Sequence, residues 1–206
     1  MGVFHVKHEG WTESAAAFDV ALDRRQASQL NSYEELLRTR AAPLGMISEA
    51  DLPRIRVRHI LDSLRVAAFV GNARSAYDLG SGAGLPGIPL AIACAGLRIT
   101  LVEARRTRAA FLELALESLG LPNASVFLGR VERLKEHVDL VTARAFTDAP
   151  GCWRVAEPLL SRGGRLVYFA GSGFEPESAG PEGADLAVFT TPGLAQSGPL
   201  AIMSRQ

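Results

Sequence analysis

The sequence contains few cysteines. Two occur among 206 residues, Cys94 and Cys152, and neither belongs to a C-x-x-C pair. This spacing excludes the common zinc-binding patterns and gives no basis for a disulfide framework. We therefore expect no metal site. We also expect Cys94, which lies in an apolar run, to be a small buried side chain.

Long hydrophobic runs are also missing. No stretch approaches the roughly 20 apolar residues that a membrane-spanning helix needs, and the first eight residues lack the apolar core of a secretory signal. The content of 48% hydrophobic and 21% charged residues is that of an ordinary globular protein. These features predict a cytoplasmic protein without a membrane partner, and we expect it to be a monomer.

Net charge is absent, because 22 basic residues balance 22 acidic ones. The distribution of charge is more informative, since arginines gather in two short segments. Local basic segments in a neutral protein suit contact with a polyanion over a restricted surface. The alternative interpretation, that these arginines only lie on solvated helix faces, stays open. The candidate RNA-binding residues are Arg54, Arg56, Arg58, Arg105, Arg106 and Arg108.

The pattern up to about residue 74 is helical. Ser32 and Glu35 have the spacing of a capping box, which predicts a helix that begins at Ser32 and ends before Pro43. A second apolar periodicity predicts a helix over about 56–69. We therefore expect an N-terminal helical extension over about 12–74.

After residue 74, short apolar runs alternate with helical stretches, which predicts an α/β fold with a mostly parallel, doubly wound sheet. A helix is expected over about 105–119, with Gly120 as its stop, and a loop over 171–185. The α/β core would cover 75–206, and residues 1–206 would form a single domain. Seven strands are predicted, over 75–79, 99–103, 125–128, 139–143, 165–169, 186–189 and 200–203, with the last two antiparallel.

A glycine-rich segment, D-L-G-S-G-A-G-L-P-G from Asp78 to Gly87, follows the first predicted strand. Its glycines allow positive φ angles and let a ligand lie against the backbone. Gly82, Gly84 and Gly87 formally match the G-x-G-x-x-G pattern of dinucleotide sites. However, Asp78 would repel a pyrophosphate, whereas it suits the ammonium group of S-adenosylmethionine (SAM). We therefore favour SAM over NAD, with Asp78 and Gly82 at the cofactor; a loop hydrogen bond is the alternative role for Asp78.

Acidic side chains also follow the second and third strands. Glu103 ends the second strand, where a carboxylate can accept hydrogen bonds from both ribose hydroxyls of a bound nucleoside. Val131 and Glu132 follow the third strand, where the adenine is expected. Val131 would pack on the ring, and Glu132 or a nearby backbone group would accept from the adenine amino group. A surface acid is the alternative role for Glu132.

The exit of the fourth strand places Arg144 near the methyl donor or a phosphate, with an ion pair to Asp148 or Asp78 as the alternative. This exit carries no Asp-Pro-Pro-Tyr-type motif and no cysteine, so we predict no residue as a certain catalytic acid, base or nucleophile. His59 and Asp62 lie three residues apart and share a helix face. We favour a role for them in anchoring that helix.

Four segments together resemble one family. They are R-H-I-L-D-S-L at 58–64, the run from Asp78 to Pro89, Val131-Glu132, and Arg144-Ala145-Phe146. Over about residues 33–171 the chain resembles the glucose-inhibited division protein B family, the small-subunit rRNA guanine-N7 methyltransferases also called methyltransferase G. The resemblance implies a Rossmann-like class I SAM-dependent methyltransferase fold. It also implies cofactor contacts at Gly80, Leu85, Val131, Glu132 and Arg144.

The sequence therefore predicts a SAM-dependent enzyme that methylates the N7 atom of a guanine in small-subunit (16S) ribosomal RNA, either free or in a ribosomal particle. Two alternatives stay open: a non-catalytic RNA-binding or ribosome-assembly module that retains the fold, and an NAD-dependent oxidoreductase. The chain departs from the family pattern at Arg40-Ala41, at Gly45-Met46-Ile47 and at Ala170.

Overall fold

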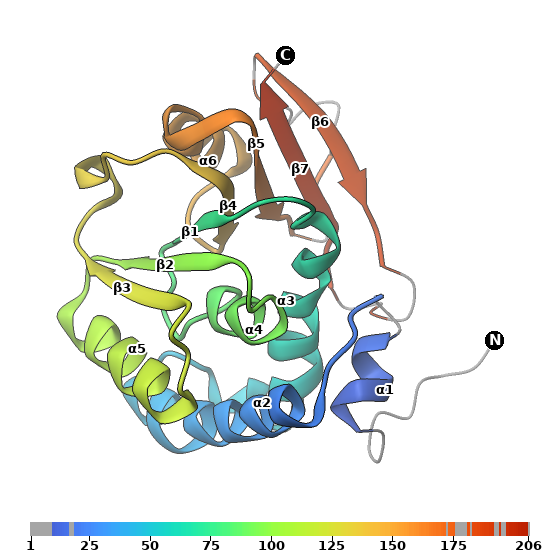
Figure 1. Ribbon diagram of the computed structural model, residues 1–206, viewed down its shortest axis with the longest axis vertical. Helices are drawn as coiled ribbons and strands as arrows, with labels where there is room; N and C mark the ends of the chain where they lie inside the picture. Colours follow the sequence, from blue (N-terminus) through green and yellow to red (C-terminus); the bar gives the residue numbers. More distant parts are fainter. Residues whose placement is uncertain are drawn as a thin grey trace.

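The computed structural model describes residues 10–16, 19–171, 173–175, 181, 183–191, 194 and 197–205. A seven-stranded sheet crosses the molecule, and helices pack on both of its faces (Figure 1). Residues 172, 176–180 and 182 of the loop predicted over 171–185 lie outside the described residues. None of the described helices is both long and apolar enough to cross a membrane.

The first two helices of the chain are α1 (Trp11–Ala16) and α2 (Arg24–Leu36). The predicted start at Ser32 is wrong, because Ser32 lies within α2. The capping box is instead formed by Asp23 and Gln26: the Asp23 carboxylate accepts from Gln26 N at 2.7 Å, and Gln26 Oε1 accepts from Asp23 N at 2.8 Å. The buried side chain of Leu30 lies in this helix upstream of the predicted start, and that of Tyr33 lies just after it.

The helix predicted over 56–69 is present, but it is not a regular α-helix. After the short helical turns η1 (Leu37–Ala41) and η2 (Ala42–Leu44), the chain forms 3₁₀ turns in η3 (Glu49–Arg54), π turns in η4 (Ile55–Leu61), one α turn in α3 (Asp62–Leu64) and 3₁₀ turns in η5 (Arg65–Phe69). π turns and mid-helix 3₁₀ turns often mark functional sites. Here η4 adjoins the carboxyl end of β4 (Val138–Arg144), where Arg144 donates to the carbonyls of Arg58 and His59.

All seven predicted strands are present, with ends that shift by a few residues. Strands β1 to β5 run parallel, and β7 pairs antiparallel with both β5 and β6, which confirms the mostly parallel sheet. The strand order is β3-β2-β1-β4-β5-β7-β6, so the order reverses between β1 and β4. The bounds are β1 (Ser75–Leu79), β2 (Arg98–Glu103), β3 (Ala124–Leu128), β4 (Val138–Arg144), β5 (Leu160–Phe169), β6 (Ala184–Phe189) and β7 (Leu200–Arg205).

The two faces of the sheet are covered differently. Helices α3, α4 (Gly87–Ala93) and α5 (Arg106–Leu119) lie on one side of the sheet, with α2 packed on α4 and α5, while α6 (Ala149–Ala156) covers part of the other face (Figure 1). One cluster of buried hydrophobic side chains joins residues of the N-terminal helices, such as Leu30 and Ile60, to Leu101 of β2. Gly120, at φ +59°, ends α5 as predicted. The N-terminal helices therefore share one core with the α/β part.

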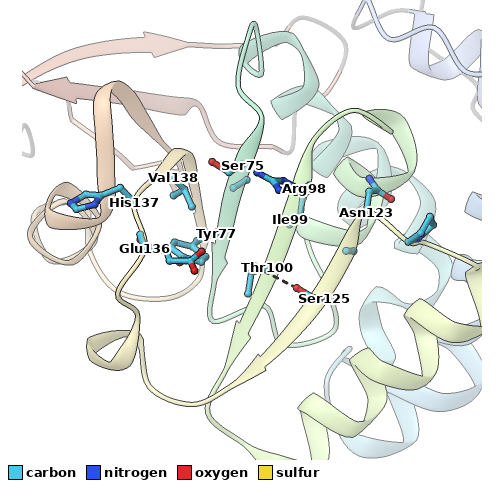
Figure 2. A pocket seen from close by; sticks show the side chains of 13 residues that line it. Ser75, Tyr77, Arg98, Ile99, Thr100, Asn123, Ser125, Glu136, His137 and Val138 are labelled. Carbon is cyan, nitrogen blue, oxygen red and sulfur yellow. Dashed lines mark hydrogen bonds between the residues drawn. The ribbon is translucent and has the colours of Figure 1, made fainter.

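The second face is open over β1–β3. The connection from β3 to β4 contains only a three-residue 3₁₀ turn, η6 (Val131–Arg133). Side chains of neighbouring strands, among them the buried Tyr77, the half-buried Thr100 and the exposed Ser125, line a cavity of about 330 Å³ there (Figure 2). This cavity reaches the amino ends of the strands, at the sheet edge opposite the glycine-rich segment.

Candidate active site

A second cavity, of about 370 Å³, lies at the carboxyl ends of the parallel strands. In open α/β sheets this is where ligands bind, close to the point where the strand order reverses. The volume falls within the roughly 300–1,000 Å³ of small-molecule sites. Its lining comes from β1, β2, β3 and the exit of β4: Gly80, Val102, Glu103, Ala104, Arg105, Arg108, Gly129, Arg130, Val131, Glu132, Ala145 and Phe146.

The glycine loop borders this cavity. Gly80, Gly82 and Gly84 have φ angles of +67°, +55° and +91°, a region that other residues rarely adopt. Gly80 N donates to the Val102 carbonyl at 2.9 Å, which fixes the loop to the end of β2. From the opposite side, the fully buried Tyr33 hydroxyl donates to the Ala83 carbonyl at 2.7 Å. The loop is therefore held between β2 and α2.

Asp78 lies beneath the loop rather than in the cavity. Its side chain is 1% exposed, Oδ1 accepts from the Thr142 hydroxyl at 2.7 Å, and Oδ2 accepts from Gly87 N at 3.2 Å. Burial raises the pKa of the Asp78 carboxyl to about 6, against the lowering effect of these hydrogen bonds. This geometry corresponds to the loop hydrogen bond, the alternative to direct contact with the cofactor.

Glu103 lies on the cavity wall, where the sequence places it. Its Oε2 accepts from Gly82 N at 3.1 Å and its Oε1 accepts from Arg105 N at 2.8 Å. A carboxylate oxygen has more than one acceptor site, so each can also accept from a ribose hydroxyl. Glu103 thus links the glycine loop of β1 to the start of α5.

The predicted adenine end is assembled in the same cavity. Val131, which is buried, and Glu132, which is exposed, both line it from η6. Leu85 is half-buried within the glycine loop, where Leu85 N donates to the Ser81 carbonyl at 3.2 Å, and it does not contribute to the cavity wall.

Arg144 turns away from the cavity toward the N-terminal helices. Its guanidinium lies 3.3 Å from the Asp62 carboxylate and donates to the carbonyls of Arg58 at 2.9 Å and His59 at 3.3 Å. Neither alternative partner, Asp148 or Asp78, makes this ion pair. Arg144 therefore fastens the end of β4 to η4 and α3, which supports the anchoring role favoured for His59 and Asp62.

The surroundings of His59 determine its protonation state and its tautomer. Burial and the nearby Arg144 charge lower the pKa of His59 to about 4, so the imidazole is neutral near pH 7. Arg144 Nη2 lies 3.2 Å from His59 Nδ1. Since a guanidinium can only donate, Nδ1 is the acceptor and the proton lies on Nε2.

The six predicted RNA-binding arginines fall into two groups. Arg54 and Arg58 both pair with Asp51 at 3.1 Å, and Arg56 pairs with Glu34 at 3.0 Å and lies over the Trp11 ring. Among the described residues, no ion pair involves Arg105, Arg106 or Arg108. Arg105 and Arg108 line the cavity, whereas Arg106 is exposed at the start of α5.

Sequence reasoning did not assign Arg130, Ala145 or Phe146 to the cavity wall, although all three line it. One feature of the sequence could have assigned Phe146 to the cavity: it is an aromatic residue two positions after Arg144, at the exit of a parallel strand. Ala145 had none, because its φ of +51° arises only from how the exit is folded.

A family model described as rRNA small subunit methyltransferase G (GidB) matches residues 26–183. The chain belongs to the GidB family. A relative with the same description from Stenotrophomonas maltophilia (strain R551-3) is 40% identical over 182 residues, 85% of each chain. One from Rhodopseudomonas palustris (strain BisA53) is 38% identical over 171 residues, 80% of this chain and 74% of the relative.

Solved structures confirm the GidB chain's fold as the Rossmann-like one of class I methyltransferases. The O-methyltransferase from Bacillus cereus in complex with SAH has a TM-score of 0.59 at 17% identity, covering 85% of this chain and 91% of that one. The O-methyltransferase TomG from Streptomyces achromogenes in complex with SAM also has a TM-score of 0.59 at 17% identity, covering 97% and 99%.

The predicted cofactor, SAM, is confirmed by the GidB family and its methyltransferase class, and the dinucleotide alternative is not supported. The residues present fit this molecule. The cavity is large enough, Glu103 offers its carboxylate at the rim, and a Cβ added at Gly82 would meet only Gly80 O, at 3.7 Å, and Arg108 Nη1, at 4.0 Å. The loop at Gly82 is thus open to an approaching ligand.

Proposed function

We propose that this GidB family member transfers a methyl group from SAM to the N7 atom of a guanine in small-subunit (16S) ribosomal RNA. The observation that carries the proposal is the cavity at the carboxyl ends of β1–β4, in which Glu103 joins the glycine loop to the start of α5. The family description supports ribosomal RNA as the acceptor.

The choice of N7 is supported by the chemistry of the cavity wall. Among the described lining residues, the acids are Glu103 and Glu132, and neither histidine nor cysteine is present. The two oxygens of Glu103 already accept backbone hydrogen bonds. An acceptor that had to lose a proton first would need a positioned base, whereas guanine N7 has a free lone pair and carries no proton.

The proposed transfer is a single displacement. The N7 lone pair forms a bond to the methyl carbon while the carbon–sulfur bond breaks, its electron pair stays on sulfur, and the positive charge moves from sulfur to the guanine. No proton is taken up or released. The residues of this chain therefore act by alignment: Glu103 and the glycine loop hold the donor, and Arg144 fixes the β4 exit beside it. Alignment of this kind supplies roughly 7–11 kcal/mol of a barrier.

A reaction without a general base predicts a flat pH profile. The single-turnover rate at saturating SAM and RNA should change less than about twofold from about pH 6.5 to 8.5, a window next to the ordinary pKa of histidine. Rapid-quench measurements of methyl transfer would test this. A tenfold rise that follows one ionisation, and that disappears when a single His, Asp or Glu is replaced without loss of ligand affinity, would contradict the mechanism.

The direct test is chemical identification of the product. Small ribosomal subunits and naked 16S RNA, both prepared from a strain without this enzyme, would be incubated with the protein and SAM, and the RNA digested and analysed by mass spectrometry. We expect 7-methylguanosine in at least one substrate. Methylation of another atom would overturn the N7 assignment. RNA binding without any methyl transfer would favour the alternative of a non-catalytic RNA-binding module.

A further inference from the structure

Phe146 is an unusual lining residue of the SAM cavity. It is 37% exposed, although large apolar side chains are ordinarily buried, and it is the one aromatic residue among the described residues that line this cavity. It lies at the exit of β4, next to the point where the strand order reverses. Its ring has none of the cofactor-binding roles assigned to Glu103, Val131 and Glu132.

The ring is held in place from several sides. It packs on Gly80, where an added Cβ would lie 2.7 Å from Phe146 Cδ2, so only glycine leaves room for it. The preceding residue, Ala145, has a left-handed φ of +51°, a strained conformation for a residue with a Cβ. On either side the backbone is anchored: Arg144 binds η4 and α3, and the Thr147 carbonyl accepts from the Tyr168 hydroxyl at 3.2 Å.

The two ends of the cavity differ in chemistry. Glu103, Val131 and Glu132 form the end suited to the ribose and adenine of SAM. The other end, between Gly80 and the exit of β4, is therefore left for the methyl group and its acceptor. A nucleobase drawn out of an RNA stack loses its neighbours, and aromatic side chains commonly replace them.

We propose that Phe146 is the stacking platform for the target guanine, holding the base at the Gly80 end of the cavity. The inference deepens the proposed function and rests on it. The ring replaces one face of the RNA stack, and its fixed position against Gly80 sets the height of the base relative to the donor.

The first test compares Phe146→Leu, which keeps an apolar contact on Gly80, with Phe146→Tyr, which keeps the aromatic face. Phe189→Leu is the matched control, because Phe189 is 43% exposed on β6 and packs on Phe69 instead. We expect Phe146→Leu to lower kcat/KM for unmethylated small ribosomal subunits by about 10- to 100-fold. SAM affinity from calorimetry should stay within about twofold. Phe146→Tyr and Phe189→Leu should keep kcat/KM within about threefold.

A second readout does not depend on turnover. Both native tryptophans, Trp11 and Trp153, are buried, so a Phe146→Trp variant adds one exposed fluorophore. In the presence of SAH, saturating 16S RNA should quench its emission beyond the change seen for the wild type. Absence of that quenching would overturn the proposal.

The outcomes separate the two levels of inference. If the wild-type protein methylates guanine N7 and Phe146→Leu is equally active, the platform is wrong and the proposed function stands. If the leucine variant loses SAM affinity in proportion to its activity, the ring contacts the cofactor and the platform is also wrong. If the wild type transfers no methyl group to guanine N7, the proposed function fails first.

Discussion

At the scale of single residues, the glycine loop depends on backbone angles that only glycine adopts readily. We predict that Gly82→Val abolishes SAM binding while the protein stays folded. The valine must take a φ near +55°, and its side chain projects into open space beside the cavity. Isothermal calorimetry with SAM, together with circular dichroism, would measure both effects.

Gly163→Val is the matched control for that substitution. Gly163 has a φ of +78° with nothing within 4 Å of an added Cβ, and it lies in β5 away from the glycine loop. It should carry a comparable backbone penalty without loss of SAM affinity. Micromolar SAM binding by a folded Gly82→Val protein would rule out this placement of the donor.

Asp78 makes stability depend on pH in a direction unusual for an acid. Its pKa is raised by burial from 3.8 to about 6 in the folded protein. The folded state therefore holds a proton that the unfolded state releases, and this contribution is present below about pH 4 and is lost as the pH rises through 6. At 1.36 kcal/mol per pKa unit the loss amounts to about 3 kcal/mol.

Asp78→Asn removes this ionisation and tests it. Asparagine keeps an acceptor for one of the two donors, and the Thr142 hydroxyl can reverse its role toward the amide. We predict that the stability of the wild type relative to Asp78→Asn falls by about 2 kcal/mol between pH 4 and pH 7, because the unfolded carboxyl is already partly ionised at pH 4. Urea unfolding at four pH values would measure the difference. A constant difference would show that Asp78 has an ordinary pKa.

At the scale of elements, α2 supports the cofactor loop through one hydroxyl. Tyr33→Phe leaves the Ala83 carbonyl without its buried donor, which we expect to cost about 1–3 kcal/mol of unfolding free energy. Because Ala83 lies between Gly82 and Gly84, SAM affinity should fall as well. Denaturation and calorimetry on the same variant would measure both.

Tyr77→Phe removes a comparable hydroxyl at the opposite edge of the sheet. The Tyr77 hydroxyl donates to the Glu136 carbonyl at 3.3 Å beside the cavity of Figure 2, where water can replace it. This control should cost less stability and leave SAM affinity unchanged. Equal effects of the two variants on SAM binding would mean that α2 does not position the loop.

At the scale of the whole molecule, the protein has no net charge, but some of its arginines are paired with acids while others are exposed without an ion pair among the described residues. We predict that Arg106→Ala lowers the slope of log affinity for RNA against log salt by about 0.7–0.9, the change expected for one lost phosphate contact. Arg106 is exposed next to the cavity and, among the described residues, takes part in no ion pair. Filter binding across a salt series would measure the slope.

Arg54→Ala is the comparison within the same set of candidates. Arg54 pairs with Asp51 at 3.1 Å, so part of its charge is already balanced inside the protein. We expect it to leave the slope unchanged, with SAM affinity equal in both variants. If Arg106→Ala also leaves the slope unchanged, Arg106 lies on a solvated helix face and does not contact RNA phosphates.

Local patterns in the sequence by themselves determined the alternation of strands and helices, the glycine loop and the acid at the end of β2. Each depends on neighbours close along the chain: apolar periodicity, the conformational freedom of glycine, and the position of Glu103 at a strand end. The N-terminal boundary at Ser32 was wrong because Asp23 and Gln26 offer the same capping chemistry nine residues earlier, and the burial of Leu30 selects that start.

Only the tertiary structure decided which way the site's side chains point. Asp78 is drawn beneath the loop by Thr142, a residue 64 positions away, and Arg144 is drawn to η4 by the carbonyl of Arg58, 86 positions away. Phe146 reaches the cavity because Gly80, in the loop that follows β1, leaves room for its ring. Such directions depend on contacts between strands and helices distant in sequence, which the pattern of any single segment does not contain.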